Sequence, residues 1–203
     1  MTRTYGGLRI VAGVVAAALV LSTIPKGIAG ASSASPPHAS FSSQVELHLS
    51  DLPNGWLIDY QTSSPDTFAG EINKQLFLMS SSVTIESSSS AALAYYETKL
   101  SRLRHGFVTK RLKSLASSRV SALVVKGIAF PSLGDRDFAF LVTDTVLYGK
   151  TKVPSSSISV RVLVGRAIIL LTSIDESSRF VAPVSLDEDV LNKMLARAHS
   201  LHL

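Results

Sequence analysis

The sequence predicts an α+β domain in which two helices pack on an antiparallel sheet of about five to six strands. Three observations predict this class. Two segments carry apolar residues at helical spacing, and several others alternate apolar and polar residues with a period of two. Their order along the chain is strand, strand, helix, four strands, helix, and short turns join the last four strands into a meander.

The chain of 203 residues opens with the pattern of a secretory signal peptide. Two arginines precede a charge-free apolar run over residues 10–25, and small residues follow that run. The run has 16 residues, which is shorter than the roughly 20 that a membrane-spanning helix needs. We therefore predict a secreted or extracytoplasmic protein whose residues 1–31 are removed by cleavage after Ala31 or Ala34. The alternative is an N-terminal signal anchor.

The rest of the chain is predicted to be one folded domain behind a linker. Residues 32–44 are rich in Ser and Pro, which is typical of a flexible linker, and residues 45–203 form the domain. A hydrophobic fraction of 46% and a charged fraction of 17% exclude a disordered chain. Because the sequence has no cysteine, it also excludes disulfides, thiolate metal sites and a cysteine nucleophile.

Two strands are predicted before the first helix. Trp56, Ile58 and Tyr60 alternate with other residues in the first strand, and Val83 and Ile85 do so in the second. This period of two is typical of a strand with one buried face.

The first predicted helix covers residues 91–105. Ser89 or Ser90 is placed to cap its N-terminus, and Gly106 is placed to take the left-handed conformation that ends a helix. Its last turn is basic, as the helix dipole favours. Its apolar stripe consists of Leu93, Tyr96, Leu100 and Leu103.

Four further strands are predicted between the helices. In the third of them, aliphatic residues alternate with serines and Arg161, so that one face is apolar and the other is mixed. The fourth is apolar on both faces, which indicates a central strand. Gly165 and Arg166 join these two through a predicted type II′ turn. The four strands cover residues 121–130, 136–147, 157–164 and 167–173.

The second predicted helix covers residues 186–201. Ser185 and Glu188 have the spacing of a capping box, and Asp187 and Asp189 add negative charge to the first turn. We interpret both aspartates as part of the cap. The buried stripe of this helix consists of Leu191, Met194, Leu195 and Ala198.

Short segments resemble those of small exported proteins of the actinobacterial type. Residues 50–56 read SDLPNGW, which resembles their DLPxGW opening, and residues 133–140 read LGDRDFAF, which is similar to their Gly-Asp strand entry. The hairpin over residues 160–171 also matches. These proteins are similar to the extracellular sensor domains of PknH-type receptor kinases and to PsbP-like sandwiches. The resemblance implies a PsbP-like α/β/α sandwich over residues 45–203 with a sensor-like role, and it supplies no catalytic residue.

A ligand site is predicted where the first strand begins. We expect a concave face near Trp56, Tyr60 and the turn over residues 133–137, and that turn carries Asp135 and Arg136. Two interpretations of Trp56 remain open at this point. It is either a core anchor beneath the sharp DLPNGW turn or an aromatic wall of the ligand cleft.

The sequence carries no recognisable catalytic motif. It has no Gly-x-Ser-x-Gly elbow and no His-Glu-x-x-His pair. His199 and His202 share a helix, but no further ligand joins them at a metal-binding spacing. We therefore predict a non-enzymatic domain without metal or cofactor, which binds a small ligand, an envelope component or a protein partner.

An exported hydrolase is one alternative function. Asp135 and Asp137 flank Arg136 at a strand start, and paired carboxylates can hydrolyse a glycosidic bond. The simpler interpretation of Asp135 is a turn residue after a glycine. Asp175 and Glu176 are likewise interpreted as a solvated turn.

A second alternative rests on the distribution of charge. From Thr98 to Gly134 the sequence has eight basic residues and no acidic one. This block, residues 99–126, is predicted to attract anionic lipids, wall phosphate polymers or other anionic surfaces. No aromatic-interleaved basic motif is present, so we expect no nucleic-acid partner. Its candidate contact residues are Arg102, Arg104, Lys110, Arg111 and Lys113.

Overall fold

The computed structural model describes residues 38–58, 67–106, 120–148, 151–175 and 184–203. The predicted signal peptide and its cleavage sites lie outside the described residues. No helix among the described residues is long and apolar enough to cross a membrane.

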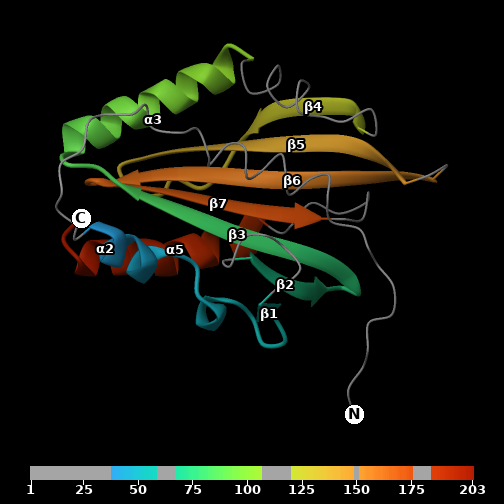
Figure 1. Cartoon of the computed structure of the whole chain (residues 1–203), viewed down its shortest axis with the longest axis horizontal. Helices are drawn as coiled ribbons and strands as arrows, with labels where there is room; N and C mark the ends of the chain where they lie inside the picture. Colours follow the sequence, from blue (N-terminus) through green and yellow to red (C-terminus); the bar gives the residue numbers. More distant parts are fainter. Residues whose placement is uncertain (1–37, 59–66, 107–119, 149–150, 176–183) are drawn as a thin grey trace.

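Seven antiparallel strands form one sheet in the order β1-β2-β3-β7-β6-β5-β4 (Figure 1). The predicted α+β class is confirmed, with seven strands where we expected five to six. The strands are β1 (Leu57–Ile58), β2 (Thr67–Ile72), β3 (Gln75–Ile85), β4 (Val120–Ile128), β5 (Arg136–Tyr148), β6 (Thr151–Val164) and β7 (Ala167–Asp175).

The strand that sequence patterning missed is β2. Its residues do not alternate, because Thr67 and Phe68 are both buried and Gly70 has no side chain. Asn73 and Lys74 join β2 to β3 with φ values of 53° and 65°. Two consecutive positive φ values are those of a type I′ hairpin turn, whose twist matches that of the strands.

The described helices are α2 (His38–Val45), α3 (Ser89–Arg104) and α5 (Val184–Ser200), with a short 3-10 helix η1 (Leu49–Asp51). Helix α2 occupies part of the segment that we predicted to be a linker. Its last residue, Val45, is fully buried in the core. The folded part of the chain therefore includes this helix, which starts at His38.

The ends of the two predicted helices differ in detail from the expectation. Ser88, rather than Ser89 or Ser90, caps α3 by accepting a hydrogen bond from the backbone N–H of Ala91 at 3.2 Å. Gly106 takes a φ of 67° after the helix, as predicted. Because α5 already begins at Val184, Ser185 lies inside the helix and the predicted capping box does not form.

The helices cover opposite faces of the sheet. On one face, Ala92 and Tyr96 of α3 pack on Leu163 of β6 and Ile168 of β7. On the other face, the buried stripe of α5 packs on the alternate residues of the same strands, among them Val162 and Ile169. Figure 1 shows α2 beside α5 at the end of the sheet near the C-terminus. We call these two surfaces the α3 face and the α5 face.

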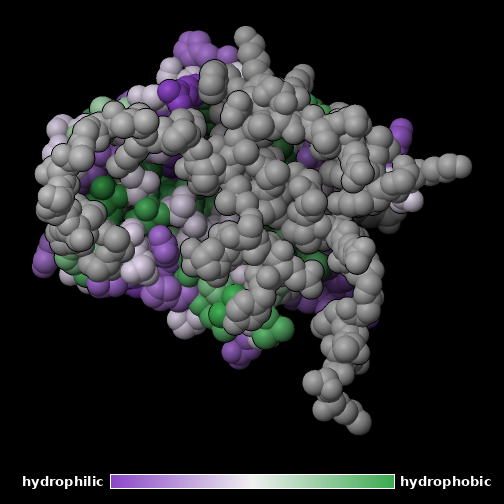
Figure 2. Space-filling model, viewed as in Figure 1, coloured by the Kyte–Doolittle hydropathy of each residue, from purple (hydrophilic) through white to green (hydrophobic). Residues whose placement is uncertain are grey.

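The β1 edge of the sheet exposes apolar side chains. Figure 2 shows a hydrophobic area at the lower edge of the view, where Figure 1 draws β1. Leu57 on β1 and Leu76 on β3 are 65% and 42% exposed. Single exposed apolar residues are common on protein surfaces, and we assign no role to these.

Candidate functional site

The α3 face of the sheet carries a layer of polar side chains. Residues directly opposite each other in an antiparallel sheet point to the same face. The register therefore places Ser159 of β6 beside Thr172 of β7, Thr172 beside Ser80 of β3, and Ser80 beside Thr67 of β2. We call these four residues the hydroxyl row. A buried sheet face is normally apolar, so this row is unusual.

The hydroxyl row is largely enclosed. Thr67 and Thr172 are each 3% exposed and Ser159 is 2% exposed, while Ser80 is half-buried. The hydroxyls of Ser159 and Thr172 lie 3.1 Å apart and share one hydrogen bond. Because each hydroxyl has one donor and two acceptor positions, this pair retains capacity for further partners.

Arg161 lies beside the hydroxyl row on the same face. It follows Ser159 by two residues on β6, and the register places it between Leu170 of β7 and Phe138 of β5. Its side chain is 5% exposed, and its guanidinium carbon lies 6.0 Å from the centre of the Phe138 ring. Arg161 is therefore a buried cation beside an aromatic ring, one pleat repeat along β6 from the hydroxyl row.

No described acidic residue neutralises Arg161. The ion pairs among the described residues join Arg136 to Glu97 and Arg197 to Asp51. The Nε–H group of Arg161 has no hydrogen-bond partner in the described part of the chain. Burial lowers the pKa of the guanidinium, and the tyrosine hydroxyls of α3 partly oppose this shift. An arginine nevertheless stays protonated in proteins.

Two tyrosines of α3 face this cation. Burial raises the pKa of Tyr96 to about 12, and its ring packs edge-on against Phe138 at 5.3 Å. Burial also acts to raise the pKa of Tyr95, but Lys99 and Arg161 outweigh it and hold that pKa below the ordinary value of 10.0. The Tyr95 hydroxyl is thus a hydrogen-bond partner for the guanidinium.

A buried carboxylate lies farther along the same face. Asp144 of β5 stands opposite Ser155 of β6, and its Oδ1 accepts a hydrogen bond of 2.6 Å from the Ser155 hydroxyl. Burial raises the pKa of Asp144, although the bond from Ser155 opposes the shift. In the register Asp144 lies six residues beyond Phe138 on β5, or about 20 Å, so it does not reach Arg161.

The predicted ligand residue Trp56 lies in the hydrophobic core. It is 4% exposed, and its indole lies directly on the backbone of Gly70, where a Cβ atom would collide with the ring. Of the two interpretations of Trp56, the packing shows the core anchor. Tyr60, its predicted neighbour, lies outside the described residues.

Asp135 and Arg136 lie at the other end of the sheet. Asp135 Oδ2 accepts the N–H of Gly165 at 2.7 Å, and its own N–H donates to Leu163 at 2.8 Å. Asp135 therefore fastens the start of β5 to the β6–β7 turn, where Gly165 takes a φ of 52°. The exposed Arg136 forms an ion pair of 2.7 Å with Glu97.

The structure does not bring these predicted ligand residues together. Gly70, on which Trp56 packs, shares a cross-strand row with Phe77 of β3. Arg136 shares a row with Leu163, Ile168 and Thr84 of β3. Phe77 and Thr84 are seven residues apart on one strand, which is about 23 Å.

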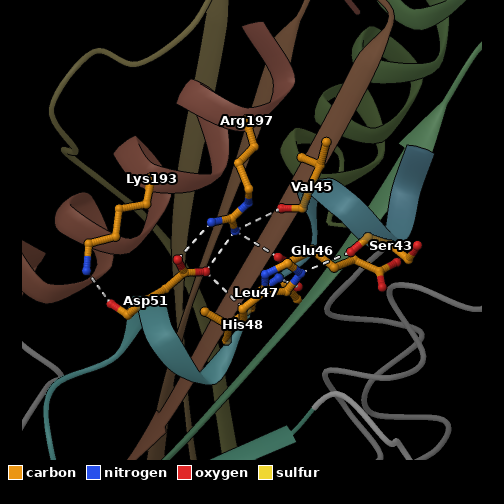
Figure 3. Close-up of polar contacts among 9 residues, drawn as sticks. Ser43, Val45, Glu46, Leu47, His48, Asp51, Lys193 and Arg197 are labelled. Atoms are coloured by element: carbon orange, nitrogen blue, oxygen red, sulfur yellow. Dashed lines mark hydrogen bonds and ion pairs between the residues drawn. The ribbon is translucent and has the colours of Figure 1, made fainter. Parts of the chain in front are cut away.

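The DLPNGW segment has a structural function that Figure 3 makes plain. Arg197 of α5 donates to both carboxylate oxygens of Asp51, at 2.8 and 2.7 Å, and to the backbone oxygen of Glu46 at 2.8 Å. Asp51 also accepts the N–H of His48, and Lys193 donates to the Asp51 backbone oxygen at 2.6 Å. We call this network the Asp51 clamp, because it fastens the last helix to η1.

Two aspartates have positions that the sequence analysis did not anticipate. Asp187 is not an exposed cap residue, since it is 1% exposed and its Oδ2 accepts a bond of 3.0 Å from Ser173 of β7. Asp175 is the last residue of β7 and is also 1% exposed, so its interpretation as a solvated turn is wrong. Glu176 lies outside the described residues.

The basic block is described only in part. Lys99 lies 4.8 Å from the centre of the Tyr95 ring, Arg102 is half-buried, and Arg104 and Lys126 are exposed. Binding of polyanions to this block stays a prediction. The remaining candidates, Lys110, Arg111 and Lys113, lie outside the described residues.

Sequence reasoning did not select Arg161 as a site residue, although it placed this residue on a mixed face. The available signal was one arginine in a strand of alternating serines and aliphatic residues. That pattern does not distinguish a solvated face from one covered by a helix. Within the described ranges, no three His, Asp or Glu side chains are grouped as metal ligands would be.

Comparisons with known proteins give a weak structural similarity. No protein-family model matches the sequence, and no curated protein matches it. Among solved structures, the extracellular domain of PknH from Mycobacterium tuberculosis is similar, with 6% sequence identity and a TM-score of 0.36. The match covers 64% of this chain and 62% of the PknH domain, so the chain spans less than two thirds of that domain. A likeness at this level carries no argument about function.

Proposed function

We propose that this chain is an extracytoplasmic, non-enzymatic domain that binds a small anionic ligand at Arg161, between α3 and the sheet. The observation that carries the proposal is a guanidinium that is 5% exposed and has no acidic partner among the described residues. The signal-peptide pattern over residues 1–31 supports the extracytoplasmic location.

The energetics of burial support a binding role. Taking a charged group out of water costs several kcal/mol even after the protein relaxes. An apolar residue of similar volume is often as good or better for stability at such a position. Neighbours such as Phe138 and Leu170 would accommodate an apolar side chain well. An arginine here is therefore costly for folding, and binding an anion would offset that cost.

The chemistry of the group selects the ligand class. A guanidinium presents its N–H donors in a planar fork that matches carboxylate and phosphate oxygens. The unpartnered Nε–H of Arg161 is one edge of that fork. In a site shielded from water, such a charge-assisted pair is stronger than on the surface.

Replacing Arg161 by methionine is expected to abolish anion binding while leaving the fold intact. Acetate, citrate, phosphate and glucuronate serve as probes in thermal unfolding. An anion at 100 times its Kd adds about 2.7 kcal/mol of stability, or a rise in Tm of about 5 to 10 °C. We expect this rise in the wild type and none in Arg161→Met, whose Tm without anion is equal to or above that of the wild type.

The matched control is Arg136→Met, which removes an exposed arginine from the predicted ligand turn. It should respond to the anion like the wild type. If no probe raises the Tm of the wild type, or if Arg161→Met responds as fully as the wild type, the proposal is wrong. A response lost only in Arg136→Met would instead place the site at the β5 turn.

The basic block supports a second candidate function, binding to an anionic lipid surface. Arg104 and Lys126 are exposed, and no acid interrupts residues 98–134. Each basic residue near such a surface contributes about 1 kcal/mol. The affinity for phosphatidylglycerol vesicles, measured by co-sedimentation, should therefore fall by roughly two to three orders of magnitude when four basic residues are changed to glutamine. These are Arg104, Lys110, Arg111 and Lys113. The control variant changes the exposed Lys74 and Lys152 and should keep most of the affinity. An equal loss of affinity in both variants would show that the basic block is not a specific binding surface.

A further inference from the structure

We infer that the anion at Arg161 is the acidic group of a sugar acid, meaning a polyhydroxylated ring that carries a carboxylate or a phosphate. This inference rests on the proposed function and adds the substrate class. It is carried by the hydroxyl row, whose member Ser159 lies two residues from Arg161 on the same face of β6.

The geometry fixes the direction in which a ligand extends from Arg161. On one side, toward Leu163 and Ile168, the face is already filled by Ala92 and Tyr96 of α3. On the other side, one pleat repeat of about 7 Å along the strand leads to Ser159 and its row. A ligand that holds the guanidinium therefore places its remaining atoms against hydroxyl groups and not against the aliphatic side.

Hydroxyl groups match sugars better than they match other anions. Ser and Thr hydroxyls donate one hydrogen bond and accept two, as sugar hydroxyls do, so each can pair with a neighbour of the same kind. The row extends over four strands, or about 14 Å between its first and last strands, which gives several such contacts. An alkyl chain in the same place would offer no bonding partner to the remaining donor and acceptor positions of these hydroxyls.

Aromatic rings complete the surface. Phe140 stands next to Ser159 in the same cross-strand row, and Phe138 stands next to Arg161. The two rings are stacked with centroids 6.3 Å apart and planes 24° from parallel. Phe140 is 3% exposed and packs with Val142 and Leu103, so the rings form an apolar wall at the β5 end of the row.

The test measures affinities of the purified protein by calorimetry for four probes: glucuronate, glucose 6-phosphate, glucose and propionate. We expect both acidic sugars, or one of them, to bind at least tenfold more tightly than propionate and glucose. The two acidic sugars distinguish a carboxylate from a phosphate source. Arg161→Met should lose all binding of the acids.

The variant that tests the hydroxyl row is the double change Ser159→Ala with Thr172→Val. It removes both partners of one hydrogen bond and keeps the shape of the side chains. Such paired replacements are close to neutral for stability. The variant should bind acidic sugars no better than propionate and should bind propionate like the wild type. Ser80→Ala, a half-buried member of the row, gives the same readout if the double variant does not fold.

Each failure has a distinct meaning. Arg161-dependent binding of propionate that equals that of the acidic sugars would overturn the sugar inference and leave the proposed function standing. Retention of the sugar preference in both hydroxyl variants would also overturn it. Absence of any Arg161-dependent anion binding would overturn the proposed function itself.

Discussion

At pH 8 the variant Asp187→Asn is expected to be more stable than the wild type by several kcal/mol. Asp187 is 1% exposed beneath the first turn of α5, and its Oδ2 accepts a hydrogen bond from Ser173 at 3.0 Å. Its Oδ1 has no partner among the described residues. Burial disfavours the charged form and raises the pKa of Asp187 from 3.8 to about 7, although the Ser173 hydroxyl opposes the shift.

The sign of the effect follows from where the proton is bound. In the unfolded chain Asp187 releases its proton near pH 3.8, whereas the folded protein keeps it until about pH 7. Between these values the folded state binds more protons, so the free energy of unfolding falls as the pH rises through this window. One pKa unit is worth about 1.4 kcal/mol, so the whole shift amounts to about 4 kcal/mol.

Urea unfolding at pH 4, 6 and 8 measures this effect. Asparagine carries no charge, keeps an oxygen for the Ser173 hydroxyl and replaces an oxygen that lacks a described partner. The free energy of unfolding of Asp187→Asn should therefore change much less between pH 4 and pH 8 than that of the wild type. Asp189→Asn, an exposed change on the same helix, is the control and should keep the full slope. An identical pH slope in Asp187→Asn would contradict the burial argument.

The position of Asp187 also shows why part of the fold could not be predicted. An acid in the first turn of a helix fits both an exposed cap and a buried contact, because the helix dipole favours it in either case. The local pattern correctly predicted α5 and its stripe of Leu191, Met194 and Leu195. Only the placement of α5 on β7 decides that Asp187 faces Ser173 and not the solvent.

The same limit applies to the candidate site. Alternation along β6 correctly predicted that Arg161 and its neighbouring serines share one face of the sheet. Whether that face is wet or covered depends on α3, which is joined to β3 and packs on β6 and β7. Strand β2 was missed because Gly70 interrupts its pattern, and this glycine is required by the indole of Trp56 that lies on it. Both features are contacts between segments that are distant in sequence.

Replacing Asp51 by alanine is expected to lower the free energy of unfolding by about 3 kcal/mol, which is the low end of the cost of breaking a buried ion pair. Asp51 is 5% exposed, and its loss leaves Arg197 without its two shortest bonds to a carboxylate. The backbone N–H of His48 loses its acceptor as well. We take the low end because the Arg197 side chain is 26% exposed and water can reach part of it.

The matched control is the ion pair between Arg136 and Glu97. Its N–O distance of 2.7 Å equals that of the Arg197–Asp51 pair, but its side chains are 55% and 44% exposed. Exposed pairs contribute about 0 to 1 kcal/mol, so Glu97→Ala should change stability by no more than that. Equal losses in Asp51→Ala and Glu97→Ala would show that burial does not strengthen the clamp.

Acid titration separates the Asp51 clamp from Asp187. Burial acts to raise the pKa of Asp51, but the hydrogen bonds and charges of Arg197 and His48 outweigh it and hold the pKa below 3.8. A depressed carboxyl pKa contributes stability that is present above its unfolded value and is lost as the pH falls through the folded value. Asp51→Asn should therefore reduce the loss of stability below pH 4 and leave the decline between pH 4 and 7 unchanged. Because Asp187 acts only in that upper window, the combined contribution of these two carboxyls to stability should be greatest near pH 4, at the boundary between the two windows.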